Sequence, residues 1–232
     1  MKLNTNSNAY IIIYSAILVV IVAFLLAFVY QALKPMQDAN VALDVKKQIL
    51  YSLNIRDLDG AEAEAKYAEV VKEEGEVEGQ KYYLCDINGE DVLVVSMKGM
   101  GLWGGISGFI SIHGDETPTV YGAYFNHESE TAGLGAEIKD SQAWQEKFIG
   151  KKVFVDGTQD VAISIVKKVE DPTTQVDVVT GATLTSNGVD DMIKAGLKDA
   201  GKRAVELFVK MQCTKDAPAD STATEEPKVE EE

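Results

Sequence analysis

The chain has 232 residues, 46% of which are hydrophobic, and its formal net charge is −15 at pH 7. The length allows one good-sized domain with additional segments, and the apolar content is ordinary for a folded protein. The negative charge argues against nucleic-acid binding, because nucleic-acid phosphates would be repelled. Seven acidic and two basic side chains lie between Thr214 and Glu232, which contain almost no large apolar residue. We therefore predict a disordered acidic tail over residues 215–232.

The amino end is a long uncharged apolar segment. No charged residue lies between Lys2 and Lys34, and the most apolar part runs from Tyr10 to Tyr30. As a helix this part would be about 31 Å long, which matches a hydrocarbon core of about 30 Å. A cleaved signal peptide has a shorter apolar region. The pattern predicts a retained transmembrane helix over residues 9–33, preceded by a short segment, residues 1–8, whose side of the membrane the lysine count leaves open.

Residues 34–80 are interpreted as a helical connecting segment. Apolar side chains recur at four-residue steps at Val41, Val45, Ile49 and Leu53, as on one face of a helix. The part from 57 to 79 is rich in Glu, Ala and Lys, which is typical of a polar helix or a solvated connection.

Alternating apolar runs then predict strands. Asn88-Gly89 lies between two such runs, which is the strongest short-range signal for a hairpin. Residues 105–127 repeat this arrangement around a polar turn at 114–118. We expect a short helix over 141–150, and two further strands at 151–157 and 160–171.

One last helix is expected from about Asn187 to Met211, with Asn187 as its cap and Asp190 three residues on. Strands thus dominate the middle of the chain and helices its ends. The predicted fold class is α+β: one mixed domain over residues 81–214, with a mostly antiparallel sheet flanked by helices.

The residues alone point to no catalytic or metal site. The sequence lacks the hydrolase, zinc-protease and phosphate-loop motifs, and His113 and His127 are interpreted as structural. Cys85 and Cys213 are far apart with no partner motif, so two isolated buried thiols are favoured, although a disulfide stays open.

Three segments rich in glycine or hydroxyl groups remain, at 99–108, 129–138 and 177–188. In the first, Trp103 either packs in the core or offers a flat surface for a ligand. In the second, glycines on both sides of Leu134 would hold one apolar side chain outward, or would simply form a turn. In the third, helix capping explains the hydroxyl groups best, with covalent attachment at one of them as the alternative.

The third segment also carries a resemblance. Asp177 to Thr183, DVVTGAT, resembles the D-x-x-[ST]-G-A-[ST] signature of proteins that bind FMN through a phosphoester to the final hydroxyl. Five features follow one another in the same order as in the C subunits of the Na⁺-translocating NADH:quinone oxidoreductases: the apolar anchor, GLWGGISGF, ET-x-GLG-x-EI, W…F-x-GKK and TGATLTS. The chain resembles this covalent-FMN-binding family over nearly its whole length.

The resemblance implies roles for individual residues. Thr183 would hold FMN, and a flavin transferase that uses FAD and Mg²⁺ would recognise Asp177, Thr180, Gly181 and Ala182. Four further residues would lie near the isoalloxazine ring: Trp103, Glu130, Thr131 and Leu134. Ala132 departs from the family, in which proline is usual at this position, so the loop here lacks a fixed φ.

The resemblance also implies a function and a location. The chain would be an electron-relay subunit, not catalytic alone, within a complex of other membrane subunits. Electrons would reach it from a membrane iron–sulfur centre and pass to a second covalent FMN. Residues 1–8 would be cytoplasmic, and the flavin domain would be periplasmic at the bacterial inner membrane. Two rival hypotheses are the G subunit of an Rnf-type ferredoxin:NAD⁺ oxidoreductase and a membrane-anchored binding module without a cofactor.

Overall fold

The computed structural model describes residues 7–115, 117–156, 158 and 160–215. Contacts divide the chain into two compact units, residues 1–46 and residues 47–232. The acidic tail predicted for 215–232 lies outside the described residues except for Lys215, which ends the last helix.

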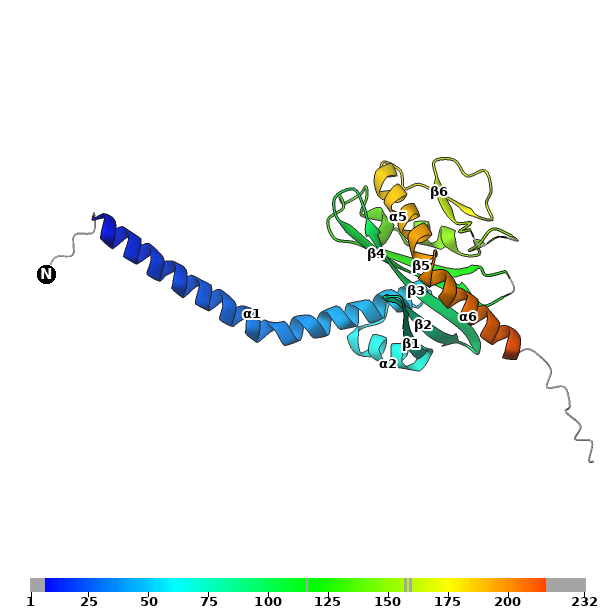
Figure 1. Ribbon diagram of the computed structural model, residues 1–232, viewed down its shortest axis with the longest axis horizontal. Coiled ribbons are helices and arrows are strands. Elements are labelled where there is room, and N and C mark those ends of the chain that lie inside the picture. Colours follow the sequence, from blue (N-terminus) through cyan, green and yellow to red (C-terminus); the bar gives the residue numbers. More distant parts are fainter. Residues whose placement is uncertain (1–6, 116, 157, 159, 216–232) are drawn as a thin grey trace, which may run out of the picture. The chain divides into compact units, whose positions relative to one another are not determined.

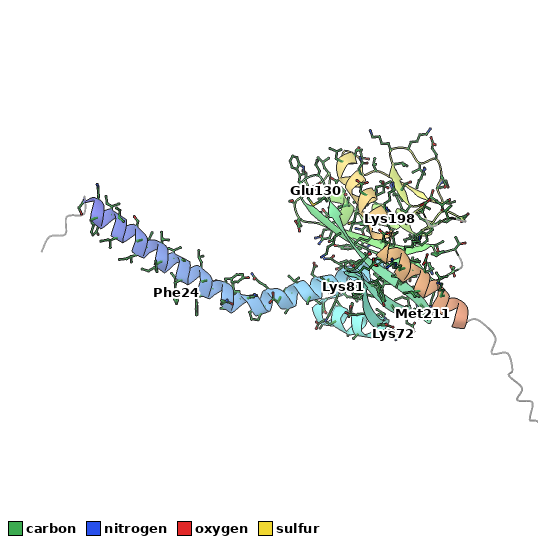
Figure 2. The ribbon with its side chains drawn as sticks, viewed as in Figure 1. Phe24, Lys72, Lys81, Glu130, Lys198 and Met211 are labelled. Atoms are coloured by element: carbon green, nitrogen blue, oxygen red, sulfur yellow. The ribbon has the colours of Figure 1, made fainter. Side chains whose placement is uncertain are left out.

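The first unit contains most of helix α1, Asn8–Ser52, which is the only described helix long and apolar enough to cross a membrane. Its large apolar side chains are exposed from Ile11 to Val41, and Figure 2 shows Phe24, which is 70% exposed, projecting from the helix. The helix continues well beyond the predicted span of 9–33 and contains Pro35. Its last residues belong to the second unit, where Ile49 and Leu50 are buried.

The second unit is built on a five-stranded antiparallel sheet in the order β1-β2-β3-β4-β5 (Figure 1). The strands are β1 Val71–Val77, β2 Gln80–Ile87, β3 Glu90–Met100, β4 Gly105–His113 and β5 Val120–His127. The predicted hairpins are confirmed. Asn88 and Gly89 join β2 to β3 with φ of 57° and 89°, the left-handed values that a two-residue hairpin turn requires.

The segment expected to be a helical connection differs from the prediction in its second half. Helix α2, Gly60–Val70, is present and begins with a capping box between Asp59 and Glu62. Strand β1 follows directly and pairs with β2. Its exposed, Glu-rich sequence lacks strand periodicity, and pairing with a neighbouring strand decided its conformation.

Both faces of the sheet are covered. Leu93 and Val95 on β3 join the main core beneath helices α5, Thr183–Gly196, and α6, Ala200–Lys215, which cross one face in Figure 1. Val92 and Val94 are equally buried on the opposite face, where helix α2 packs and where the end of α1 contacts the sheet through Ser52 and Tyr51. Central strands covered on both sides read as a continuous apolar run, as in VLVV.

The region between β5 and α5 contains the short helices α3, Glu137–Asp140, and α4, Gln142–Gln145, followed by a 3₁₀ turn, Glu146–Phe148. The short helix expected at 141–150 is therefore confirmed. The two strands expected at 151–157 and 160–171 are largely wrong. Among the described residues of these segments, isolated bridges form at Lys152 and at Phe154, and the three-residue β6, Ser164–Val166, pairs in parallel with β7, Gln175–Asp177.

The single carboxy-terminal helix expected from Asn187 to Met211 is also corrected. The chain forms α5 and α6, separated at Leu197–Asp199, and α5 begins four residues earlier than predicted. Asn187 lies inside α5 and does not cap it, and the Asp190 carboxylate accepts a hydrogen bond from the Ile165 amide instead. Capping residues such as Asn also occur inside helices, and the buried face of α5 determined where it starts.

Candidate functional site

The first turn of α5 is the centre of the candidate site. Gly181, with φ of 79°, turns the chain into the helix, and Ala182 precedes the first helical residue, Thr183. No side chain caps this helix, and its first turn contains no acidic residue. The free amide groups and the positive end of the helix dipole therefore favour an anion at this point.

The three hydroxyl groups of this turn have different surroundings. The Thr185 hydroxyl, on a side chain buried to 1% exposure, donates a hydrogen bond to Glu130 over 2.6 Å. The Ser186 hydroxyl, fully buried, accepts one from the Val179 amide over 3.0 Å. Thr183 is half-buried, and within the described residues its hydroxyl has no hydrogen-bond partner. Of these three residues, only Thr183 is partly exposed and has a hydroxyl that no described residue engages.

Glu130 brings the three predicted segments together. Figure 2 labels it beside the amino-terminal part of α5. Its buried carboxylate accepts the Thr185 hydroxyl at one oxygen and the Trp103 amide, over 2.8 Å, at the other. Burial, the largest influence, raises the pKa of Glu130, but the Thr185 hydroxyl and the amides of the 102–104 loop outweigh it and lower that pKa below its ordinary value. Glu130 is therefore ionised at neutral pH.

A group of exposed apolar side chains comes from the same three segments. These are Met100, Leu102, Trp103, Leu134 and Leu184. Trp103 is 67% exposed, so the interpretation that it packs in the core is wrong. Leu134 is 44% exposed and points toward Gly181, where an added Cβ would lie 2.9 Å from its Cδ2 atom. Exposed apolar side chains thus lie at the start of α5, with Leu184 next to Thr183 in the chain and Leu134 against Gly181.

The remaining predicted residues are located around this centre. The Asp177 carboxylate accepts two hydrogen bonds from the Lys147 ammonium, over 2.8 and 2.9 Å. Thr180 is exposed, and Ala182 is buried. Thr131 is also exposed, and its carbonyl accepts hydrogen bonds from the Leu134 and Ala136 amides, so this residue shapes the 131–136 turn.

The comparisons with known proteins concern this same region. A family model described as FMN-binding domain matches residues 101–198, which include all nine predicted site residues. The C subunit of the Na(+)-translocating NADH-quinone reductase from Pseudomonas aeruginosa is 38% identical over 133 residues, which cover 55% of this chain and 49% of that protein. The corresponding Haemophilus ducreyi protein is 41% identical over 132 residues, covering 56% and 46%. The chain spans about half the length of the curated relatives it matches.

Solved structures extend the comparison to the fold. The crystal structure of the Na(+)-translocating NADH-quinone reductase C subunit from Parabacteroides distasonis is 33% identical, with a TM-score of 0.67, and the match covers 75% of this chain and 96% of that one. The chain belongs to the C-subunit family of the Na(+)-translocating NADH-quinone reductases. Shewanella oneidensis NqrC, at 19% identity and a TM-score of 0.60, shares the fold. The α+β class predicted from the sequence is confirmed.

Within this NqrC fold, the structure reveals three residues that the sequence reasoning missed. Thr185 is tied to Glu130, Lys147 pairs with Asp177, and Trp144 donates its indole N–H to the Asp177 carbonyl over 2.8 Å. Thr185 was visible in the sequence as a neighbouring hydroxyl, but its burial was not. Lys147 and Trp144 carry no local signal, because 30 or more residues separate them from Asp177.

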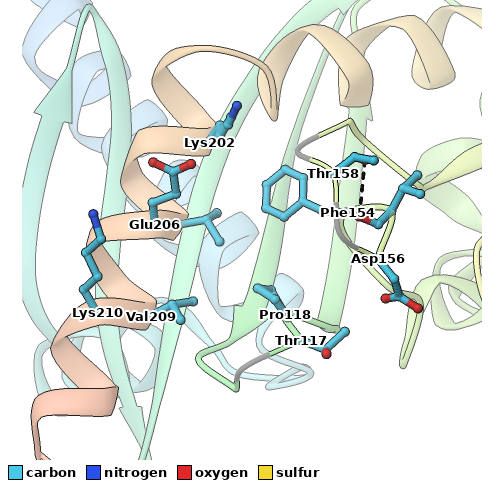
Figure 3. A pocket seen from close by; sticks show the side chains of 11 residues that line it. Thr117, Pro118, Phe154, Asp156, Thr158, Lys202, Glu206, Val209 and Lys210 are labelled. Atoms are coloured by element: carbon cyan, nitrogen blue, oxygen red, sulfur yellow. Dashed lines mark hydrogen bonds between the residues drawn. The ribbon is translucent and has the colours of Figure 1, made fainter.

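A cavity with a volume of about 570 Å³ lies away from this site, between α6 and residues 117–118, 154–156 and 158 (Figure 3). Lys202, Glu206 and Lys210 form its charged wall, and Phe154 and Val209 supply apolar surface. None of the nine predicted residues lines it. The candidate site is instead an exposed surface around one turn of helix, which suits a ligand held by a covalent bond.

Among the described residues, the cysteine and histidine side chains form no second centre. Burial raises the pKa of the Cys85 thiol to about 12, so Cys85 is the unreactive buried thiol that was favoured from the sequence. The side chain of Cys213 lies outside the described residues. His113 contacts Glu90 over 2.6 Å, and the His127 ring accepts the Glu130 amide. Within the described part of the chain, no group of His, Cys, Asp or Glu could hold a metal ion.

Proposed function

We propose that the chain is an electron-carrying subunit that holds FMN through a phosphoester to the Thr183 hydroxyl. The observation that carries this proposal is the contrast within one helical turn. Thr183 is half-buried and its hydroxyl has no hydrogen-bond partner among the described residues, whereas Thr185 and Ser186 are buried and engaged. The match of residues 101–198 to the FMN-binding domain identifies the class of ligand.

The residues present fit a phosphoester. A phosphate on Thr183 would lie at the first position of a 14-residue helix, next to amide groups that no side chain caps. Such a position favours negative charge by about 0.3–1 kcal/mol. The small residues Gly181 and Ala182 leave the approach to the hydroxyl open.

The same surroundings suit the ring and a transferase. The exposed side chains of Trp103, Leu134 and Leu184 offer flat apolar contact for an isoalloxazine ring, which supplies the redox chemistry when bound. Asp177, Thr180 and Gly181 lie at least partly at the surface, where a flavin transferase has to recognise them. Glu130 and Thr131 shape the neighbouring loops, by holding the Trp103 amide and by closing the 131–136 turn.

The proposed setting follows from the family. The chain would work within a Na⁺-translocating NADH:quinone oxidoreductase, an oxidoreductase and ion translocase, together with other subunits and without catalysing turnover alone. Helix α1 would anchor it in the bacterial inner membrane, with the flavin domain on the periplasmic side. Electrons would arrive from a membrane iron–sulfur centre and leave to a second covalent FMN. Tethering would prevent loss of a soluble cofactor by dilution in that compartment.

The test is mass spectrometry of the peptide spanning Asp177–Lys194, from full chain expressed with and without the flavin transferase. We expect the mass of one FMN phosphoester on the peptide only when the transferase is present. Thr183→Ala should abolish the modification completely, because the accepting oxygen is removed.

Thr185→Ser is the matched control, since it retains the buried hydroxyl and should be modified at Thr183 as the wild type is. An unmodified wild-type peptide would favour the binding module without cofactor. Modification that persists in Thr183→Ala would place the acceptor elsewhere in the turn.

A further inference from the structure

One carboxylate ties three segments that are far apart in the chain. Glu130 is 7% exposed. It accepts the amide of Trp103, 27 residues before it, at Oε1 and the hydroxyl of Thr185, 55 residues after it, at Oε2. Glu130 thus hydrogen-bonds both the Trp103 loop and the first turn of α5, while the Ser129 hydroxyl donates to the Trp103 carbonyl over 3.1 Å.

Two glycines leave space for this carboxylate. A Cβ added at Gly101 would lie 2.5 Å from Glu130 Oε1. A Cβ at Gly135 would lie 2.5 Å from Oε2 and 2.7 Å from the Thr185 hydroxyl. Gly133, by contrast, has no atom within 4 Å of such a Cβ and is required by its φ of 71°. The two glycines beside Leu134 therefore have different roles, and only Gly135 serves the carboxylate.

The carboxylate is held by hydrogen bonds rather than by a cation. Among the described residues, no lysine or arginine forms a salt bridge with Glu130. The hydrogen bonds from an amide and a hydroxyl to a buried carboxylate are directional, because each donor has to point at its acceptor oxygen. Loss of either partner would leave part of a buried charge unsatisfied.

We propose that Glu130 is a positioning residue, whose two hydrogen bonds join the Trp103 backbone to the first turn of α5 and so set where the Trp103 side chain stands relative to Thr183. Where the proposal concerns FMN it rests on the proposed function. The inference that Glu130 organises the Trp103 loop stands without the cofactor.

The first experiment needs no flavin. Hydrogen exchange of the Trp103 amide is measured in the full chain in detergent, expressed without the transferase. Glu130→Ala should accelerate this exchange by about tenfold or more, the factor that corresponds to about 1.4 kcal/mol. Thr185→Val should accelerate it less, because the Trp103 amide keeps its acceptor while the carboxylate loses its second anchor.

Two conservative variants separate bonding from folding. Thr185→Ser keeps the donor and should restore the wild-type exchange rate. The glutamine in Glu130→Gln can accept a hydrogen bond from the Trp103 amide and donate one to the Thr185 hydroxyl. Exchange of the Trp103 amide should therefore be slower in Glu130→Gln than in Glu130→Ala. Glu128→Ala removes an exposed carboxylate two residues away and should change nothing. If the exchange rate of the Trp103 amide in both Glu130→Ala and Thr185→Val stays within about twofold of the wild-type rate, the proposal is wrong.

The second experiment uses chain loaded with FMN. The indole of Trp103 quenches flavin emission when it lies against the ring, so Trp103→Phe and Glu130→Ala should both brighten the bound flavin. Emission that rises in Trp103→Phe alone would overturn the positioning role. Emission that rises in neither would overturn the placement of Trp103 beside the cofactor.

The failures of the two proposals are distinguishable. A chain that stays unmodified at Thr183 contradicts the proposed function, and the exchange experiment still decides the role of Glu130. A chain that is modified but has an unchanged Trp103 exchange rate in Glu130→Ala contradicts only the positioning role.

Discussion

Two regions of this protein expose large apolar side chains, and they do so in different ways. Along α1, from Ile11 to Leu33, exposed apolar residues follow one another in sequence and cover every side of the helix. In the candidate site, the exposed side chains of Trp103, Leu134 and Leu184 come from three separate segments. An apolar surface on all sides is typical of a helix surrounded by lipid. A small group of exposed apolar side chains drawn from separate segments is typical of a binding surface.

The largest effect is expected from charges in α1. Leu18→Lys combined with Val22→Lys should prevent membrane insertion, because two lysines at the centre of a span cost roughly 5–7 kcal/mol. The measurement is the amount of chain, expressed alone, that stays in membranes after an alkaline carbonate wash. Trp103→Lys combined with Leu184→Lys should leave that amount unchanged. Equal loss in both double variants would remove the distinction between the two surfaces.

A smaller effect separates the two tryptophans. Trp144 is 4% exposed and packs against Phe125 and Phe148 with ring centroids 5.7 and 5.2 Å away. Trp144→Ala should lower the free energy of unfolding by about 3–5 kcal/mol, the usual cost of a large cavity. Trp103→Ala should change it by no more than about 0.5 kcal/mol. Urea denaturation followed by circular dichroism measures both, and a large loss in Trp103→Ala would show that this side chain is buried.

The smallest effect distinguishes the glycines beside Leu134. Gly135→Ala should destabilise the fold by about 1–3 kcal/mol, because the new Cβ displaces Glu130 from Thr185 and breaks a charge-assisted hydrogen bond. Gly133→Ala should cost about 1 kcal/mol for its left-handed backbone alone. Only Gly135→Ala should also accelerate exchange of the Trp103 amide. Acceleration in Gly133→Ala, or none in Gly135→Ala, would contradict this assignment.

Local signals were enough for several elements. The Asn88-Gly89 turn and the alternating runs predicted both hairpins correctly, because turn conformation and strand periodicity are properties of adjacent residues. The long uncharged apolar run of α1 likewise predicted a helix from adjacent residues alone. Strand β1 and the break between α5 and α6 were missed, since strand pairing and the packing of Leu197 and Ala200 depend on distant residues.

The site shows the same division at the level of single side chains. The order of residues around Thr183 determined that several hydroxyl groups and glycines would gather at the start of a helix, and it carried the family resemblance. Only the tertiary structure decided that Thr185 faces inward to Glu130 while Thr183 stays open, and that Trp103 lies at the surface. Burial and hydrogen bonding between residues 55 positions apart are set by how the whole chain packs, so no local pattern encodes them.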